Sequence, residues 1–417
     1  MNNKYKPRIL DKLLQNKMNS VGGILILGPK DIGKTWMGQN FTKSQIYFKQ
    51  NETTLQQVKL DNSIALNGKF PRLIDEWQLY PWIMNAVITN IGFINKNNLY
   101  ILTGSSTPNE KSIKNLHSGA GRIARLMLRP LTLFEMNLSN KRVNFRDLFA
   151  NKKKNITFIG GLKLQDYINV ILKGGWPRNY FLDVSTACDN MIDYVENICE
   201  VDLQELDSPP NPSKMKDIMS AIARNIGTQA EIKTMAKEAR ISRLNTVSNY
   251  MEQLTKIFIL DELKPWKTHI RSSVRIRQSP KWYFVDPCIA VACLHLTYEK
   301  LWNDFNAFGF YFESLAIKEL RVYADALGGK VYFYKDTTDL EIDAIVETRN
   351  GWAAFEIKLG DDKGIEKGIK NLKRFKEKIH DFKNNKPTSF NIITAGQHAY
   401  TTEDGINIIP LSHLYID

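Results

Sequence analysis

Short apolar runs alternate with stretches of helical spacing over the first part of the chain. The runs fall at residues 24–27, 73–74 and 100–102, and apolar positions between them recur at steps of three and four. Such alternation is typical of a parallel sheet with helices on both faces. We therefore predict an α/β domain over residues 1–155.

Helical spacing dominates the next part of the chain. It is broken at residues 208–212, where the sequence Ser-Pro-Pro-Asn-Pro predicts a linker, because proline stiffens the backbone and lacks an N–H donor. We predict a helical linker or lid region over residues 156–211.

Two helices and a strand follow this linker. Helices are predicted at 230–239 and 242–254, and a strand at 258–264, which is a winged-helix pattern over residues 212–280. The apolar residues that would form buried stripes, at steps of three and four, are Met235, Ala239, Val247, Met251 and Leu254.

The second of these helices has a polar face that would suit a DNA major groove. Its candidate contacts are Arg243, Asn245 and Asn249. A module that only packs or dimerises is the alternative, and acids such as Glu252 weaken a DNA face.

Aromatic-rich strands return in the C-terminal part, residues 281–417. Asn350-Gly351 favours a two-residue turn between strands at 341–346 and 352–357, with Arg349 opposite Trp352 and Asp343 opposite Lys358. Because strand side chains alternate, the three charged residues Asp343, Glu356 and Lys358 would share one face. A solvated face carrying cross-strand ion pairs is the plain interpretation.

A final amphipathic helix is predicted beyond residue 361. Its cationic positions are Lys363, Lys367, Lys370, Arg374 and Lys378, and its apolar positions are Ile365, Ile369, Leu372, Phe375 and Ile379. The cationic stripe is either a solvated face or a salt-sensitive contact to nucleic-acid phosphates.

Composition narrows the class of protein. A length of 417 residues allows two to four domains, and 43% hydrophobic with 24% charged residues excludes a disordered or fibrous chain. Lys and Arg (57) exceed Asp and Glu (44) by 13, which suits an anionic partner such as DNA. The start is polar and no apolar run could span a membrane, so we expect a cytoplasmic protein with no membrane partner. The four cysteines lack C-x-x-C spacing, which predicts reduced thiols.

A phosphate-loop motif follows the first apolar run. Residues 28–35 fit G-x-x-x-x-G-K-[ST] between a predicted strand and a predicted helix. The backbone N–H groups of such a loop bind phosphate oxygens, Lys34 reaches the β- and γ-phosphates, and the Thr35 hydroxyl ligates Mg²⁺. The predicted nucleotide-binding residues are Gly28, Pro29, Lys30, Asp31, Ile32, Gly33, Lys34, Thr35 and Trp36.

The next two apolar runs end in polar residues. Asp75 and Glu76 close the second run, where the first acid would hold Mg²⁺ and the second would polarise the attacking water. The third run ends in Thr103-Gly-Ser105, which should lie beside the phosphate loop, so that Thr103 or Ser105 could sense the γ-phosphate. A simple Gly-Ser turn is the alternative.

These motifs resemble those of a prokaryotic AAA-type ATPase family whose members join the ATPase to a winged helix and a C-terminal nuclease-like domain. The resemblance extends over nearly the whole chain, through Gly121-Arg122, Arg129–Glu135 and a Gly-Gly-Trp-Pro step at 174–177. It implies ATP and Mg²⁺ as cofactors and ATP hydrolysis. Arg122 would be the trigger arginine, in cis or from a neighbouring subunit of a homo-oligomer, with Arg125 and Arg129 as competitors.

The C-terminal part also resembles PD-(D/E)xK nucleases. Asp343 and Glu356-Ile-Lys358 match their D…E-x-K core, and Glu313 matches the acid on their first helix. By this resemblance Asp343 and Glu356 would ligate Mg²⁺, Glu313 would support the shell, and Lys358 would orient water or phosphate. Lys335 stands where that family commonly has arginine, and the six histidines lack ligand spacing.

Three functions follow from these patterns. The leading hypothesis is a Mg²⁺-dependent ATPase whose nucleotide state governs a C-terminal half that engages a partner, with DNA the expected one. The alternatives are a non-hydrolysing ATP-gated DNA-binding or regulatory module, and an ATP-regulated metal-dependent nuclease.

Overall fold

The structure is a computed structural model, and its contacts divide the chain into two compact units. It describes residues 5–50, 52–107, 119–150, 155–206, 208–266, 279–379 and 387–417. The N-terminal unit contains Met1–Pro130, Glu205–Pro209 and Glu252–Ile259. The C-terminal unit contains Leu131–Gln204, Pro210–Met251 and Leu260–Asp417.

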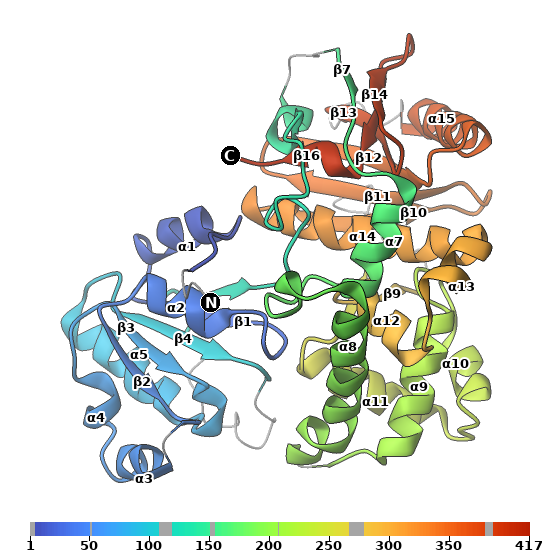
Figure 1. The fold of residues 1–417 in the computed structure, drawn as a ribbon. Coiled ribbons are helices and arrows are strands. Elements are labelled where there is room, and N and C mark those ends of the chain that lie inside the picture. The colour runs from blue at the N-terminus through green and yellow to red at the C-terminus, as the bar shows by residue number, and fades with distance from the viewer. Residues whose placement is uncertain are drawn as a thin grey trace. The chain divides into compact units, whose positions relative to one another are not determined.

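The N-terminal unit is built on a parallel sheet, as predicted. In the described residues the strand order is β2-β3-β4-β1-β5, and Figure 1 labels β1, β2, β3 and β4. The strands are β1 (Gly23–Leu27), β2 (Ser44–Tyr47), β3 (Arg72–Asp75), β4 (Tyr100–Gly104) and β5 (Ile123–Met127). Since β4 lies between β1 and β3, the carboxyl ends of the three predicted runs are neighbours at one edge.

Helices pack against this sheet through a shared apolar core. Leu25, Ile74 and Leu102 of three adjacent strands are buried together with Val87 and Ile88 of α5. Burial of these side chains away from water stabilises the sheet and holds in place the edge at which the three strands end. The helices are α1 (Asp11–Met18), α2 (Lys34–Asn40), α3 (Glu52–Leu60), α4 (Ser63–Leu66) and α5 (Ile83–Ile94).

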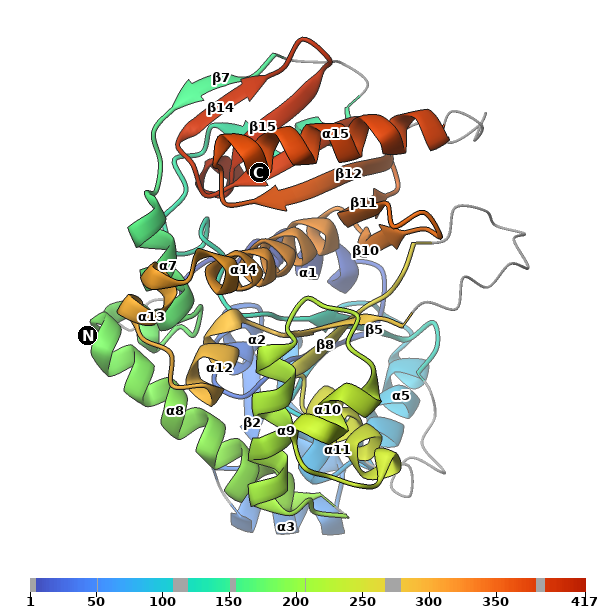
Figure 2. The ribbon, with the colours of Figure 1, turned by 90° about the vertical axis from the view of Figure 1, so that its right-hand side faces the viewer.

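The C-terminal unit contains a mixed sheet with helices on its two faces. In the described residues its order is β10-β11-β12-β13-β15-β14-β7. Helix α14 (Phe305–Ala326) lies on one face and α15 (Asp362–Lys378) on the other (Figure 2). The strands are β7 (Thr157–Ile159), β10 (Lys330–Lys335), β11 (Glu341–Thr348), β12 (Gly351–Lys358), β13 (Ser389–Thr394), β14 (His398–Thr401) and β15 (Ile406–Pro410).

The hairpin between β11 and β12 differs from its predicted register by two residues. Thr348 pairs with Gly351, so the turn is Arg349-Asn350 rather than Asn350-Gly351. Gly351 has a positive φ of 126°, a conformation that favours glycine, and its carbonyl accepts a hydrogen bond from Thr348 Oγ1 at 3.0 Å. Gly351 is therefore the first residue of β12 that pairs with β11. Because the register differs by an even number of residues, each side chain stays on the face predicted for it.

Helices dominate the rest of this unit. Helix α10 (Ile232–Glu238) is followed by α11 (Leu244–Lys256), whose residues from Glu252 onward belong to the N-terminal unit, and the antiparallel strands β8 (Leu260–Leu263) and β9 (Lys281–Phe284) come next. The predicted stripe from Met235 to Leu254 is buried, which confirms the helical periodicity. Remaining elements are α7 (Leu164–Lys173), α8 (Val184–Glu200), α9 (Pro212–Arg224), α12 (Pro287–Cys293), α13 (Tyr298–Asn303), and the paired strands β6 (Val143–Asn144) and β16 (Leu414–Tyr415).

A short connector, residues 131–135, begins the C-terminal unit earlier than the predicted domain end at 155. Both carboxylate oxygens of Glu319 accept a hydrogen bond from the Leu133 N–H at 3.1 Å. Lys318 Nζ donates to the Leu131 carbonyl at 2.9 Å and pairs with Asp286 at 3.3 Å. All of these charged groups are buried, so the connector is bound to α14 by a fully desolvated ion network.

Two further expectations concern cysteines and membranes. The four cysteines, Cys188, Cys199, Cys288 and Cys293, carry free thiols. In the part of the chain that the structure describes, no helix has the length and apolar character needed to cross a bilayer.

Candidate functional site

The phosphate-loop motif forms a tight turn between β1 and α2. Gly28 and Gly33 have φ of 151° and 92°, values that favour glycine. A Cβ on Gly28 would lie 2.3 Å from the Leu128 carbonyl oxygen, so this position accepts no side chain. Helix α2 begins at Lys34, and the N–H groups of its first turn therefore face the end of the loop.

Lys34 is folded back over this loop. Its side chain is 4% exposed, and its Nζ donates to the Pro29 carbonyl at 2.6 Å. Burial lowers the pKa of Lys34 to about 8, although Glu76, Asp31 and Asp75 oppose the shift. A single carbonyl thus holds an ammonium group that a phosphate would hold more strongly.

Asp75, at the end of β3, joins the loop to the neighbouring strand. Its Oδ1 accepts hydrogen bonds from Thr35 Oγ1 at 2.8 Å and from Thr103 Oγ1 at 2.5 Å. Burial raises the pKa of Asp75, and these two hydroxyls partly oppose that rise. The structure therefore brings together the hydroxyl and the carboxylate that were predicted to hold Mg²⁺.

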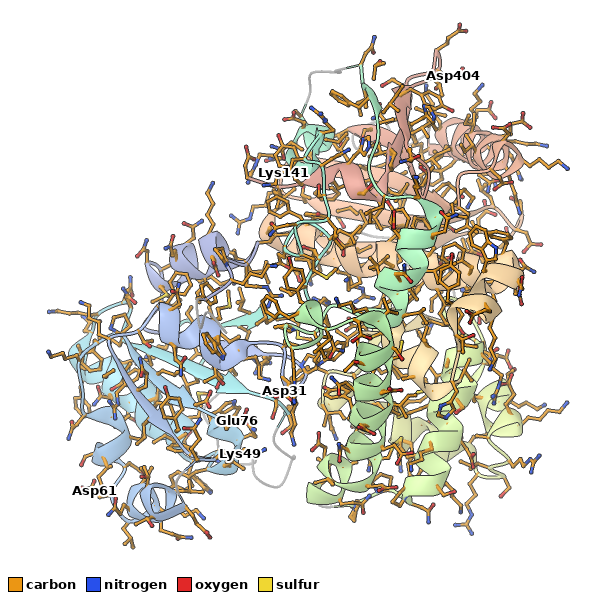
Figure 3. All side chains as sticks on the ribbon, in the orientation of Figure 1. Asp31, Lys49, Asp61, Glu76, Lys141 and Asp404 are labelled. Carbon is orange, nitrogen blue, oxygen red and sulfur yellow. The ribbon has the colours of Figure 1, made fainter. Side chains whose placement is uncertain are left out.

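Glu76 has a left-handed backbone at φ 56°. Its N–H donates to Thr103 Oγ1 at 3.1 Å. Its carboxylate accepts hydrogen bonds from Ser105 Oγ at 2.9 Å and from Gln78 Nε2. A non-glycine residue in this conformation costs free energy, and such residues concentrate at functional sites. Figure 3 shows Glu76 and Asp31 at the same end of the sheet.

The two candidate γ-phosphate sensors are used differently. Thr103 bridges Asp75 and the Glu76 N–H, whereas Ser105 contacts the Glu76 carboxylate. Both side chains are buried. Thr103 and Ser105 hold Asp75 and Glu76 in place, so contact with a phosphate is not needed to explain either hydroxyl.

Arg122 lies at the opposite edge of the sheet from the phosphate loop. The Gly23 N–H donates to the Arg122 carbonyl, and β1 runs four further residues before the loop begins, roughly 13 Å at the usual strand rise. The Arg122 guanidinium donates to the Ile88 carbonyl at 3.4 Å. The arginine is thus placed away from phosphates bound to its own loop.

Arg8 and Gln78 are site residues that sequence reasoning missed. The buried Arg8 guanidinium donates to the loop carbonyl of Ile32 at 3.1 Å and to the Arg129 carbonyl at 2.5 Å. Arg129, one of the competing trigger arginines, therefore lies beside the phosphate loop, whereas Arg125 is exposed within β5. Gln78 follows Glu76 by two residues, but no sequence periodicity marks Gln78 or Arg8 as a site residue.

The C-terminal unit gathers a second polar site, which we call the carboxylate cluster: Glu313, Glu341, Asp343 and Glu356. Asp343 Oδ2 accepts hydrogen bonds from the Ile357 N–H at 2.7 Å and from Lys358 Nζ at 2.8 Å. Lys358 Nζ is also 2.5 Å from Glu356 Oε2. The predicted trio thus meets on one face, joined through the lysine.

Glu313 has partners from outside the predicted set. Its Oε1 accepts hydrogen bonds from Tyr283 OH at 2.6 Å and from Lys281 Nζ at 3.3 Å, both on β9. Lys281 Nζ is also 2.6 Å from Glu341 Oε1. These two residues were missed because they lie about 30 residues before Glu313 and outside the motif.

Charges perturb one another throughout the cluster. Burial, followed by the charge of Asp343, raises the pKa of Glu356 to about 8. Burial also raises the pKa of Glu313. Burial would raise the pKa of Asp343 as well, but Lys358 and Lys281 outweigh it and hold that pKa below its usual value.

The remaining candidates lie on exposed surfaces. Arg243, Asn245 and Asn249 are exposed on or next to α11, and the five cationic residues of α15 are exposed along that helix. Across the described ranges, no three His, Cys, Asp or Glu side chains are arranged to hold a metal ion. His117 and His380 lie outside those ranges.

Three segments of the chain match models of known protein domains. Residues 164–300 match a domain of unknown function (DUF8612), and residues 308–414 match another (DUF4143). Residues 22–137 match the AAA domain. The curated proteins include no significant match.

Solved structures give only distant similarities. A Walker-type ATPase of Pyrococcus abyssi is 14% identical, with a TM-score of 0.42 over 68% of this chain and 94% of that one. AMPPCP-bound DnaA of Aquifex aeolicus is 10% identical (0.27; 59% and 86%), and the Aeropyrum pernix Orc1 protein in complex with DNA is 13% identical (0.29; 68% and 91%). Similarities this weak carry no inference about ligands.

The AAA match and the geometry of the N-terminal unit agree. The matched residues contain the parallel sheet, the phosphate loop and the acids that follow β3. Residues 22–137 are accordingly an AAA-type domain with a P-loop NTPase-like fold.

Proposed function

We propose that this protein binds ATP with Mg²⁺ at the phosphate loop and hydrolyses it. The observation that carries the proposal is the bonded set of Thr35, Asp75 and Thr103 directly beside buried Lys34. Three strands that are separate in the sequence deliver these groups to one edge of the sheet.

The residues present fit a nucleotide-bound Mg²⁺. Such an ion keeps several waters and takes few protein ligands, and Thr35 Oγ1 and Asp75 Oδ1 are already adjacent. When bound, Mg²⁺ neutralises phosphate charge during transfer of the γ-phosphoryl group. Lys34 would exchange the Pro29 carbonyl for phosphate oxygens, and Glu76 would orient the attacking water.

Hydrolysis is favoured over a purely gating role by the way Glu76 is held. Its left-handed backbone and its bonds from Ser105 and Gln78 fix the carboxylate beside Asp75. A binding module would not need such a carboxylate. The arrangement resembles a base that is positioned before the reaction begins.

Lys34 should take up a proton when ATP binds at alkaline pH. Its pKa of about 8 leaves it mostly neutral at pH 8.5, whereas bound phosphates favour the ammonium form. We expect an uptake of roughly 0.75 proton per ATP at pH 8.5, and an affinity that falls as the pH rises above 8. Calorimetry in two buffers of different ionisation enthalpy measures the uptake. Zero uptake at pH 8.5 would contradict this assignment.

The connector supports control of the C-terminal unit by the nucleotide. Arg8 bonds both the phosphate-loop carbonyl of Ile32 and the carbonyl of Arg129. Two residues later the chain enters the connector, which Lys318 and Glu319 bind to α14. A change at the loop would therefore reach α14 through a short and well-bonded path.

DNA is the partner that two exposed faces favour for this C-terminal unit. The cationic face of α15 and the polar residues of α11 are both exposed. Binding through these faces would weaken steeply with salt.

Amide hydrogen exchange tests whether the nucleotide controls the C-terminal unit. We expect ATP, compared with ADP and with no nucleotide, to change exchange in peptides covering residues 129–135 and α14. The Leu133 amide, bonded by Glu319, is the most informative probe. Peptides of α15 serve as the internal reference. If exchange at residues 129–135 were the same with and without nucleotide, control of the C-terminal unit by the nucleotide would be contradicted.

A further inference from the structure

Three lysines bond the carboxylate cluster from different parts of the C-terminal unit. Lys358 lies within hydrogen-bond distance of Asp343 and Glu356, as described above. Lys281 pairs with Glu313 and Glu341, and Lys335 Nζ is 3.3 Å from the second oxygen of Glu341. Four carboxyl groups therefore face three ammonium groups.

Three of the four oxygens of Asp343 and Glu356 already have donors. Asp343 Oδ2 accepts two hydrogen bonds, Glu356 Oε2 accepts Lys358, and Glu356 Oε1 accepts Asn371 Nδ2 at 3.3 Å. A cation of this kind would have to displace these donors, and it is repelled by nearby ammonium groups. The residues present thus do not fit the metal that the nuclease resemblance implies.

Lys281 is the decisive residue because it is an addition to the motif. It comes from β9, which pairs with β8 rather than with the β10–β15 sheet. Its side chain is only 3% exposed, so water does not screen its charge. Tyr283, two residues on, donates to the same Glu313 oxygen that Lys281 contacts.

We propose that Lys281 and Lys358 are the resident cations of the carboxylate cluster, so that the C-terminal unit functions without a divalent metal and does not cleave nucleic acid by a metal-dependent reaction. The cluster instead binds β9 to α14 and to the β11–β12 hairpin. This inference goes beyond the proposed ATPase function and is independent of it.

Removal of Lys281 should uncover a metal site. Lys281→Met would leave Glu313 and Asp343 buried with less compensation, which is destabilising and attracts a cation. We expect the nucleotide-free full chain of this variant to bind about one more Mn²⁺ than wild type, measured by the loss of the free-Mn²⁺ EPR signal. The added site should disappear in the double variant Lys281→Met/Asp343→Asn.

Two controls make the test sharp. Lys373→Met removes an exposed lysine that pairs with Asp404 in the same unit, and it should bind Mn²⁺ as wild type does. Wild type and Asp343→Asn should also bind Mn²⁺ equally, which tests the proposal even if Lys281→Met does not fold. A Mn²⁺ site in wild type that Asp343→Asn removes would overturn it, as would a folded Lys281→Met with no added Mn²⁺. So would Mg²⁺-dependent plasmid cleavage that Asp343→Asn abolishes.

Discussion

Lys34→Ala is expected to abolish ATP binding while the protein stays folded. The substitution removes the ammonium group that would contact the β- and γ-phosphates, and charge-assisted contacts of this kind are the strong ones. We expect an affinity at least about 100-fold weaker, roughly 2.7 kcal/mol. Fluorescence anisotropy with a labelled ATP analogue measures it.

The fold should tolerate this change well. The free Lys34 ammonium is buried against a single carbonyl, and burial disfavours its charged form. Its loss should therefore leave the thermal unfolding midpoint unchanged or slightly higher. Lys59→Ala, at an exposed position of α3, is the matched control and should bind as wild type. Equal affinity in Lys34→Ala and Lys59→Ala would refute the nucleotide site.

Glu76→Gln is expected to separate binding from hydrolysis. The amide keeps the shape of the carboxylate but cannot accept a proton from the attacking water, and loss of such a base costs about 100-fold or more. ATP affinity should stay within about twofold, because Lys34, Thr35 and Asp75 are unchanged. Phosphate release under saturating Mg²⁺ and ATP measures turnover.

The same measurement decides between the two main functions. In a non-hydrolysing gate, wild type would release no more phosphate than Glu76→Gln does. Glu52→Gln, an exposed acid at the start of α3, controls for the loss of one negative charge and should turn over ATP normally. Turnover in Glu76→Gln close to that of Glu52→Gln would rule out Glu76 as the base.

The candidate nucleotide site could be predicted because the residues that form it are marked by local sequence patterns. Each polar group that meets at the edge directly follows a short apolar run, and parallel strands align such ends. The sequence could not show the order of the strands, so it offered Thr103 as a phosphate sensor and did not predict its hydrogen bond to Asp75. It also could not show that Arg122 precedes its strand at the far edge.

The C-terminal cluster was only partly predictable for the opposite reason. Alternation within the hairpin placed Asp343, Glu356 and Lys358 on one face, and this survived a register that differs by two residues. Lys281 comes from a strand of another sheet, and no spacing in the sequence connects it to Glu313. Long-range partners of this kind decide the charge of a site, although the motif alone suggests a metal.

The position of β4 between β1 and β3 has a consequence for the lifetime of the protein. Residues that would hold one nucleotide and its Mg²⁺ follow β1 and β3, which are distant along the chain and separated in the sheet by β4, so the unfolded chain cannot assemble them. A ligand that binds only the native state adds RT ln(1 + [L]/Kd) to stability, about 2.7 kcal/mol at a hundredfold excess over Kd. At low cellular ATP the native state would then be less stable, and the protein would be degraded by proteases faster than at high ATP.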